Sequence, residues 1–302
     1  MLLSASRRTD LPAFYSEWFL RRLREGFLLV RHPRDAGVLW RVGLSPEWVD
    51  CIVFWTKNPL PMLGRLDELD RLGYPYYFQF TLTPYGPELE PGLPDKRALA
   101  DAFRALSARI GPGRVVWRYD PVVLDAGHPL PWHLERFQAL CGALAPYTRR
   151  CVFSFVDAYP QLHGGFRELG AAEMRAVAEG FAKIAGAYGL PLDTCCERLD
   201  LAEFGIRQGA CIDPALAGEA AGAAIRARRD PGQRPGCGCA ESVDVGAYGT
   251  CRHGCAYCYA GGGRAAPPHD TASPLLCGRP RGDERIVDRT APSLKDGQLT
   301  LY

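Results

Sequence analysis

The residues best suited to chemistry lie late in the chain, in the run GTCRHGCAYCYA (249–260), where Cys251, Cys255 and Cys258 have the spacing C-x₃-C-x₂-C. Thiolates are the usual protein ligands of iron–sulfur clusters, and three of them can each bind one iron of a cubane. The fourth iron then has no nearby protein ligand and can bind a small molecule. Gly254 permits the tight turn that lets Cys255 face the same centre as Cys251.

A zinc site is the main alternative for this run. Structural zinc sites use paired cysteine knuckles that close a tetrahedron, and Cys237, Cys239 or His253 could supply the missing ligand. A chain with twelve cysteines and a predicted cytoplasmic location is not expected to use them as a disulfide framework. Metal binding or redox chemistry is therefore the first interpretation of the cysteines.

Further cysteines could hold a second cubane cluster. Cys195 ends an apolar run, Cys211 lies in GACID, and Cys237 and Cys239 form a C-x-C pair in RPGCGCAES. Four thiols would give complete Cys₄ ligation. Cys195 is preferred to Cys196 because adjacent side chains of an extended run point to opposite faces. The alternative is a mixture of buried thiols that bind nothing.

Short apolar runs alternate with amphipathic helical stretches along most of the chain. The runs are LLSAS, FLLVRHP, CIVFWTKNP, YYFQFTLTPYG, RVVWRYDPVVL, CVFSFVDAYP, LPLDTCCE and AESVDVGAYGTC. This order predicts βαβ units and an α/β fold with a parallel sheet. We favour a (β/α) barrel, complete or partial, with an open doubly wound sheet as the alternative. The run FLLVRHP could instead form a hairpin with VLWRVGLSP.

Residues 1–260 are predicted to form this barrel, and residues 261–302 a loop-rich tail of glycine, proline and charged residues. No apolar run is long enough to span a bilayer, and the N-terminus lacks the pattern of a signal peptide. We therefore predict a cytoplasmic protein with no membrane partner. The formal net charge of +2 gives no overall attraction to nucleic acid, although local basic patches leave such a partner open.

Polar residues follow nearly every apolar run, and in a barrel such positions meet at the carboxyl ends of the strands, where active sites form. Lys57 follows one run and could bind an anionic substrate. Asp120 and Glu197 follow two others and could position a substrate or accept a proton. For each of these three candidate catalytic residues, a salt bridge without a catalytic role is the alternative.

The run CRHGCAYCYA resembles the cysteine motif of radical S-adenosylmethionine (SAM) enzymes, including the aromatic residue before the third cysteine. In that superfamily, SAM binds the open iron of a [4Fe–4S] cluster and is cleaved by one electron to a 5′-deoxyadenosyl radical, which abstracts hydrogen from a substrate. The resemblance implies that Cys251, Cys255 and Cys258 are the cluster ligands. It also implies that Tyr257 lies beside the adenine and that a flavodoxin or ferredoxin donates the electron.

Most members of that superfamily carry the motif after the first strand, whereas here it follows the last one. A circular permutation accounts for this position, because the first and last strands of a closed barrel are neighbours. The run AESVDVGAYGTC then occupies the usual first-strand place beside LLSAS. SASRRTD stands where SAM is expected to bind, so Ser4, Ser6 and Arg7 are predicted to hold SAM. The alternative is that they are helix caps and surface charges.

Two further resemblances extend this interpretation. FWTKNPLPMLGRLDEL and FQFTLTPYGPELEPGLPDKRALADAFRAL are similar to central strands of the spore-photoproduct-lyase-like branch of the superfamily. SASRRTDLPAFY, FWTKNP, GACID, RPGCGC and TCRHGCAYCYA resemble the bacterial family named domain of unknown function 1848. We therefore expect a radical SAM enzyme of unknown substrate. The alternative is a non-catalytic iron–sulfur or zinc protein that transfers electrons or scaffolds a partner.

Overall fold

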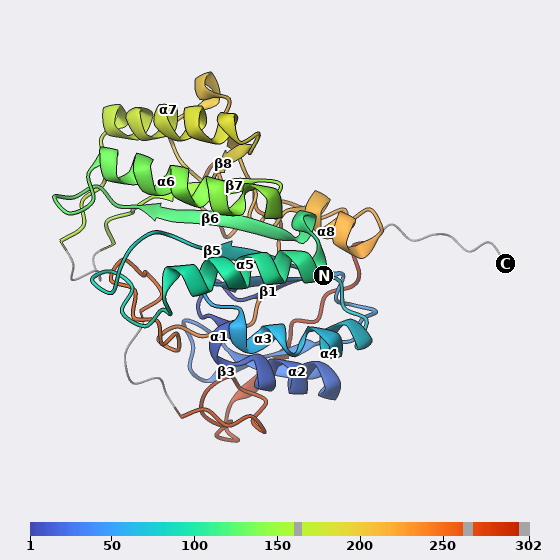
Figure 1. Cartoon of the computed structure of the whole chain (residues 1–302). Helices are drawn as coiled ribbons and strands as arrows, with labels where there is room; N and C mark the ends of the chain where they lie inside the picture. Colours follow the sequence, from blue (N-terminus) through green and yellow to red (C-terminus); the bar gives the residue numbers. More distant parts are fainter. Residues whose placement is uncertain (160–164, 262–267, 296–302) are drawn as a thin grey trace.

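The computed structural model describes residues 1–159, 165–261 and 268–295. Eight strands form one sheet in the order β10-β1-β4-β5-β6-β7-β8-β9, and every pairing in it is parallel (Figure 1). Its strands are β1 (Leu2–Ala5), β4 (Cys51–Thr56), β5 (Tyr76–Thr81), β6 (Val115–Val122), β7 (Cys151–Phe155), β8 (Leu192–Thr194), β9 (Arg207–Gln208) and β10 (Val243–Asp244). The predicted α/β fold with a large parallel sheet is therefore confirmed.

A second sheet, of three strands, is built around a hairpin. β2 (Phe27–Arg31) and β3 (Val38–Gly43) pair antiparallel, which confirms the hairpin considered for the run FLLVRHP. β11 (Arg285–Asp288) pairs in parallel with β3. The loop prediction for segment 261–302 is therefore wrong at β11. This segment forms a strand because pairing with β3 satisfies its backbone N–H and C=O groups.

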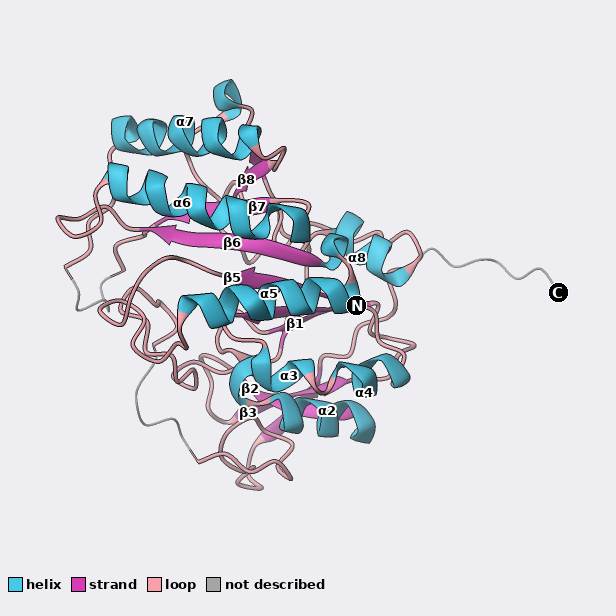
Figure 2. Cartoon of the chain, in the orientation of Figure 1, coloured by secondary structure: helices cyan, strands magenta, loops and turns pink. Residues whose placement is uncertain are grey.

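Helices form a layer over one face of the large sheet, and α5, α6 and α7 lie side by side in it (Figure 2). Alternate strand residues point to opposite faces, and Phe54, Phe78 and Trp117 belong to the apolar core on this side. The α-helices on either face are α1 (Leu11–Phe14), α2 (Ser16–Glu25), α3 (Leu60–Leu63), α4 (Leu66–Arg71), α5 (Lys96–Ile110), α6 (Leu130–Leu144), α7 (Ala171–Ala187) and α8 (Pro214–Ala221), and α8 lies on the opposite face from α5, α6 and α7. Within the described ranges, none of the helices has the length and apolar character needed to cross a membrane.

The opposite face of the sheet, which we call the inner face, is covered by residues 209–240 with α8. Val53, Tyr77 and Val116 form a separate apolar core there with Leu216 of α8. The side chains that alternate with the helix-facing residues of each strand therefore meet a loop-rich segment rather than a layer of long helices. This difference matters for the site, because loops can present cysteines and backbone N–H groups to the inner face.

Local signals set the ends of several helices. The carboxylate of Asp95 accepts a hydrogen bond from the backbone N–H of Arg97 and so caps the start of α5. α2 ends at Gly26, whose φ of 78° is a left-handed conformation that favours glycine. Glu173 accepts a hydrogen bond from the backbone N–H of Gly170 at the start of α7. Capping of this kind satisfies backbone groups at the helix ends that have no partner within the helix.

The last strand of the large sheet lies beside the first. Leu3 of β1 is opposite Val243 of β10, and Ser4 is opposite Asp244, as predicted for these two runs. No pairing joins β9 to β10 within the residues that the structure describes, so the hydrogen-bonded sheet has two edges. Because all eight strands run in one direction, their carboxyl ends share one side of the sheet (Figure 1). The cysteine run follows β10 on that side.

One buried histidine makes the stability of this fold sensitive to acid. His133 of α6 lies 2.8 Å from the hydroxyl of Tyr119 through Nδ1 and 2.8 Å from the carbonyl oxygen of Val123 through Nε2. Burial lowers the pKa of His133 to about 4. The unfolded chain takes up this proton near pH ~6.5, whereas the folded protein resists it. The contribution of His133 to the free energy of unfolding is therefore complete above pH ~6.5 and is lost as the pH falls toward 4.

We predict that His133→Asn lowers the free energy of unfolding at pH 7 by about 1–3 kcal/mol, because buried partners lose hydrogen bonds. The difference from wild type should shrink between pH 6.5 and 4.5, where wild type loses the contribution of His133. Urea unfolding followed by tryptophan fluorescence measures both effects. His32→Asn, at a half-exposed position, is the control. A difference that stays constant over this pH range would contradict the prediction.

Candidate metal centre

Residues 249–260, which we call the cysteine loop, bring the three thiols of the C-x₃-C-x₂-C run within electrostatic range of one another. All three cysteines are free and half-buried, and the charge of Cys255 interacts with both Cys251 and Cys258. Gly254 has a φ of 66°, the left-handed conformation expected for the tight turn. A Cβ on Gly92 would lie 2.6 Å from the carbonyl oxygen of His253, so the loop packs closely on the segment after β5.

The buried carboxylate of Asp10 ties the cysteine loop to the sheet. His253 Nε2 donates to Asp10 Oδ2 at 2.8 Å. Thr56 Oγ1 donates to Asp10 Oδ1 at 2.8 Å, and the backbone N–H of Lys57 donates to Oδ2 at 2.7 Å. The backbone N–H of Ala13 donates at 2.9 Å, which also caps α1. Asp10 therefore joins the start of α1, the end of β4 and the cysteine loop.

This geometry does not support the zinc alternative. The Nε2 atom of His253 is already bonded to Asp10, and Cys239 interacts with Cys211 and Cys237 instead of with the cysteine loop. Among the residues described by the structure, no three His, Cys, Asp or Glu side chains are placed around one metal ion. A cubane has a different requirement, because each thiolate binds a different iron.

Lys57 lies in a buried polar network beside the cysteine loop. Its Nζ atom lies 2.8 Å from Glu90 Oε1 and 2.9 Å from the hydroxyl of Tyr257. Thr83 Oγ1 donates to the same Glu90 oxygen at 2.8 Å, and Lys96 forms an ion pair with the carboxylate. Burial opposes the ionisation of Glu90, but the two ammonium groups outweigh it and lower the pKa of Glu90 to about 2. The carboxylate is therefore charged and fully paired.

Asp120, a predicted catalytic residue, lies on the inner face between two groups of thiols. It forms an ion pair with Arg118 and accepts a hydrogen bond from Ser154. Burial raises the pKa of Asp120, but Arg118 outweighs this effect and the net pKa is lowered. The carboxylate interacts electrostatically with Cys258 of the cysteine loop and with Cys195 after β8. Asp120 thus interacts with thiols of both groups.

Glu197 lies farther along the same edge, in a hollow of about 360 Å³ that Asp157 and Arg234 also line. Its Oε1 atom accepts a hydrogen bond from the backbone N–H of Phe155 at 2.9 Å. Burial, together with the nearby charges of Asp157 and Asp120, raises the pKa of Glu197 to about 7. The structure therefore places Glu197 within electrostatic range of Asp120, in a hollow of its own.

The predicted SAM-binding residues at the end of β1 are bonded to the neighbouring strand. Ser4 Oγ and Ser6 Oγ donate to the carboxylate of Asp244 at 2.8 and 2.6 Å, and the backbone N–H of Arg7 donates to it at 2.9 Å. The Arg7 guanidinium lies 5.5 Å from the centroid of the Trp55 ring. The hydroxyl groups thus hold β1 to β10, and their role toward SAM stays a prediction.

The cysteines predicted for a second cluster also come together, at the inner face. Cys195 Sγ lies 3.2 Å from Cys211 Sγ, and Cys239 interacts with Cys211 and Cys237. Cys196, in contrast, points its sulfur toward the carbonyl oxygen of Pro235 at 3.8 Å. Cys195 thus lies beside Cys211, whereas Cys196 follows it in a bend after β8 and has a φ of 59°.

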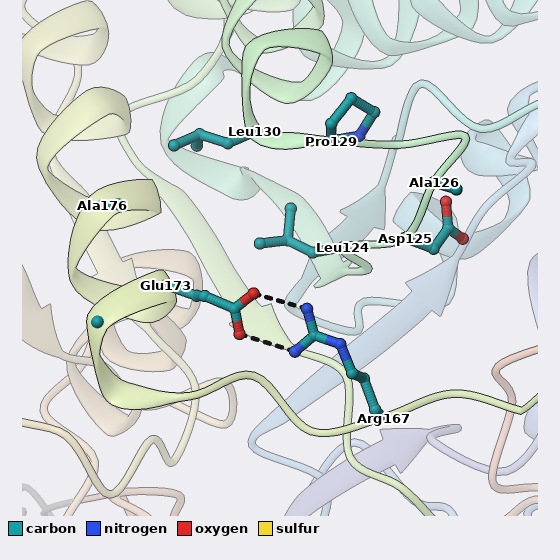
Figure 3. A pocket seen from close by; sticks show the side chains of 9 residues that line it. Leu124, Asp125, Ala126, Pro129, Leu130, Arg167, Glu173 and Ala176 are labelled. Carbon is teal, nitrogen blue, oxygen red and sulfur yellow. Dashed lines mark hydrogen bonds and ion pairs between the residues drawn. The ribbon is translucent and has the colours of Figure 1, made fainter.

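A separate hollow lies on the helix side and contains none of these residues. It has a volume of about 580 Å³ and lies between the start of α6 and α7 (Figure 3). An ion pair between Arg167 and Glu173, at 2.6 Å, borders it. Leu124, Pro129 and Leu130 form its apolar wall. No thiol or predicted catalytic residue lines it, so the cysteine loop is the better candidate site.

Sequence reasoning missed several residues of the site. Glu90 and Lys96 complete the network of Lys57, and His253 is a partner of Asp10 rather than a metal ligand. Their sequence separations are large, 243 residues for the pair of Asp10 and His253. The one available signal was the position of Glu90 in the segment that resembles the lyase-like branch.

Comparison with known proteins gives the family of the chain. The family model "Domain of unknown function (DUF1848)" matches residues 2–260. The chain belongs to this family. No curated protein matches it. Among solved structures, a crystal structure from Bacteroides thetaiotaomicron VPI-5482, named for alpha-L-fucosidase activity, is similar over 52% of this chain and 68% of that chain. Its 13% identity and TM-score of 0.27 are too low to support an argument.

We predict that Asp10→Asn lowers the free energy of unfolding by about 2–3 kcal/mol, because an amide NH₂ cannot accept the hydrogen bonds from His253 and Lys57. Urea unfolding of the purified chain measures this effect. Asp101→Asn, at a side chain that is 65% exposed, should change stability by less than about 0.5 kcal/mol. Equal losses in both variants would contradict the role assigned to Asp10.

Proposed function

We propose that this protein is a radical SAM enzyme that binds a [4Fe–4S] cluster through Cys251, Cys255 and Cys258. One observation supports the proposal most directly. The C-x₃-C-x₂-C loop follows a strand of a parallel sheet at its carboxyl end, and its thiols lie within electrostatic range of one another. Ligands of open α/β sheets bind outside the carboxyl ends of the strands. The polar residues that follow the other strands lie on this same side.

We further propose that the large sheet is a partial (β/α) barrel in a circularly permuted order. The position of β10 beside β1 supports this proposal, because a strand late in the chain takes the place before the first one. The layer of helices would be the outside of the barrel, and the inner face with residues 209–240 would be its interior.

The side chains of the cysteine loop suit such a cluster. Burial raises the pKa of Cys251 and Cys255 to about 12, so iron must displace the thiol protons when it binds. The backbone N–H groups of Asp10 and His253 partly offset this effect, because they favour the thiolate of Cys251. When bound, the cluster supplies the electron that cleaves SAM.

The charged and aromatic groups around the loop would position the ligands. Glu90 and Tyr257 hold the ammonium of Lys57, so its orientation is set before any ligand binds. Lys57 would contact an anionic group of SAM or substrate, and the ionised carboxylate of Asp120 would accept hydrogen bonds from substrate. The buried ring of Tyr85, whose centroid lies 5.9 Å from that of Tyr257, would form an apolar wall beside the loop.

We predict that the anaerobically reconstituted and reduced protein forms 5′-deoxyadenosine from SAM. The variant Cys255→Ala should form none above background, because one iron loses its ligand. Chromatography of the quenched reaction measures the product. The control is Cys277→Ala, whose sulfur lies 4.0 Å from the hydroxyl of Tyr15 and outside both thiol groups; it should retain wild-type product formation.

A different result would exclude this function. If the wild-type protein carries a reducible cluster but forms no 5′-deoxyadenosine, and SAM leaves its electron paramagnetic resonance (EPR) spectrum unchanged, the protein is not a radical SAM enzyme. A non-catalytic iron–sulfur protein for electron transfer would then account for the cluster.

A further inference from the structure

Four thiols from three separate segments meet at the inner face of the sheet, near the end of β8. We call them the inner-face thiols: Cys195, Cys211, Cys237 and Cys239. The sulfur atoms of Cys195 and Cys211 lie 3.2 Å apart, and the side chain of Cys239 interacts with those of Cys211 and Cys237. All four are free, and all but the half-buried Cys195 are buried. They form one continuous group of sulfur atoms.

N–H groups donate to these sulfur atoms. The backbone N–H groups of Cys211 and Ile212 donate to Cys239 Sγ at 3.3 and 3.5 Å. Arg118 Nη1 donates to Cys211 Sγ at 2.7 Å. A neutral thiol is a weak acceptor, and these N–H donors would stabilise Cys211 and Cys239 as thiolates when a cluster is bound. Hydrogen bonds to the sulfur atoms are one of the means by which proteins tune iron–sulfur clusters.

Two arginines supply positive charge at the same place. Their guanidinium groups lie over the Trp55 ring, Arg7 at 5.5 Å and Arg118 at 5.3 Å from its centroid. Arg7 interacts electrostatically with Cys239 and Cys211. Its Nη2 atom is buried and has no hydrogen-bond partner in the described part of the chain. Such a donor is costly to bury unless it finds an acceptor, and a sulfur atom of a bound cluster would be one.

Glycines let the segments that carry the thiols approach each other. A Cβ on Gly238, between Cys237 and Cys239, would lie 3.3 Å from the carbonyl oxygen of Gly209. A Cβ on Gly209 would lie 2.9 Å from the Cβ of Asp193. Larger residues at these two positions would push the loops apart. The close packing of backbone around the sulfur atoms therefore has a direct basis in the sequence.

We propose that the inner-face thiols ligate a second [4Fe–4S] cluster, separate from that of the cysteine loop. Four thiolates carry a large negative charge, which the two arginines offset. A zinc ion held by the same four thiols is the alternative occupant, because zinc also takes complete Cys₄ ligation. With a cysteine for each iron, this cluster would leave no iron open to SAM. The inference goes beyond the proposed function and does not depend on SAM cleavage.

The decisive variant removes the first site and keeps the second. Cys251→Ala, Cys255→Ala and Cys258→Ala are combined in one full-length chain and purified without oxygen. We expect it to retain about four irons and about four sulfides per chain, compared with about eight of each in wild type. After reduction, it should give a cluster EPR signal that added SAM leaves unchanged.

The complementary variant removes the second site. The double variant Cys211→Ser with Cys239→Ser should lose about half of the eight irons of wild type and keep the signal that responds to SAM. The matched control is Cys196→Ser, which is adjacent to Cys195 but whose sulfur faces the carbonyl oxygen of Pro235. It should keep all the iron.

Three results would overturn the proposal. They are an iron-free triple variant with a wild-type circular dichroism spectrum, a zinc ion in place of the second set of irons, and a Cys195–Cys211 disulfide in the anaerobically purified protein. If the triple variant fails to fold, an unchanged iron content in the folded double variant overturns it as well. Failure of SAM cleavage in wild type would refute the proposed function alone, because the iron of the triple variant is counted without SAM.

Discussion

A buried carboxylate, that of Asp10, connects the parts of the molecule that make the candidate site. It accepts hydrogen bonds from the start of α1, the end of β4 and the cysteine loop, which are far apart in the sequence. A loop has no regular backbone ladder, so its position depends on contacts of this kind. A buried carboxylate is costly unless its hydrogen-bond donors are all present. Each of the three segments that supply donors to Asp10 therefore depends on the other two for its position.

The two faces of the large sheet differ in polarity. The helix side is apolar, with Phe54 and Trp117 in a continuous core. The inner face carries Arg118, Asp120 and Ser154 near the carboxyl ends of the strands. Parallel sheets usually bury apolar residues on both faces, so these polar groups would be costly if they were not bonded to one another and to the thiols. A departure of this kind from local rules is typical of functional sites.

Local patterns in the sequence were sufficient to predict the main strands and helices and to single out the candidate ligand thiols. Strand and helix signals act over a few residues, which explains why the runs and caps predicted the parallel sheet. Cys195 and Cys196 are separated by a bend after β8, where Cys196 has a φ of 59°, rather than by alternation along a strand. Composition predicted loops for the segment that contains β11. That segment is a strand because it pairs with β3, which is distant in the sequence.

The sequence by itself determined the strand–helix order, the family and the residue types that can bind iron. Only the tertiary structure decided which of them share a site. In the folded chain, Ser4 and Ser6 donate to Asp244, and Lys57 forms an ion pair with Glu90. His253 is bonded to Asp10, which is 243 residues away in the sequence. The physical reason is that such partners are chosen by packing of distant segments, which no local period or spacing records.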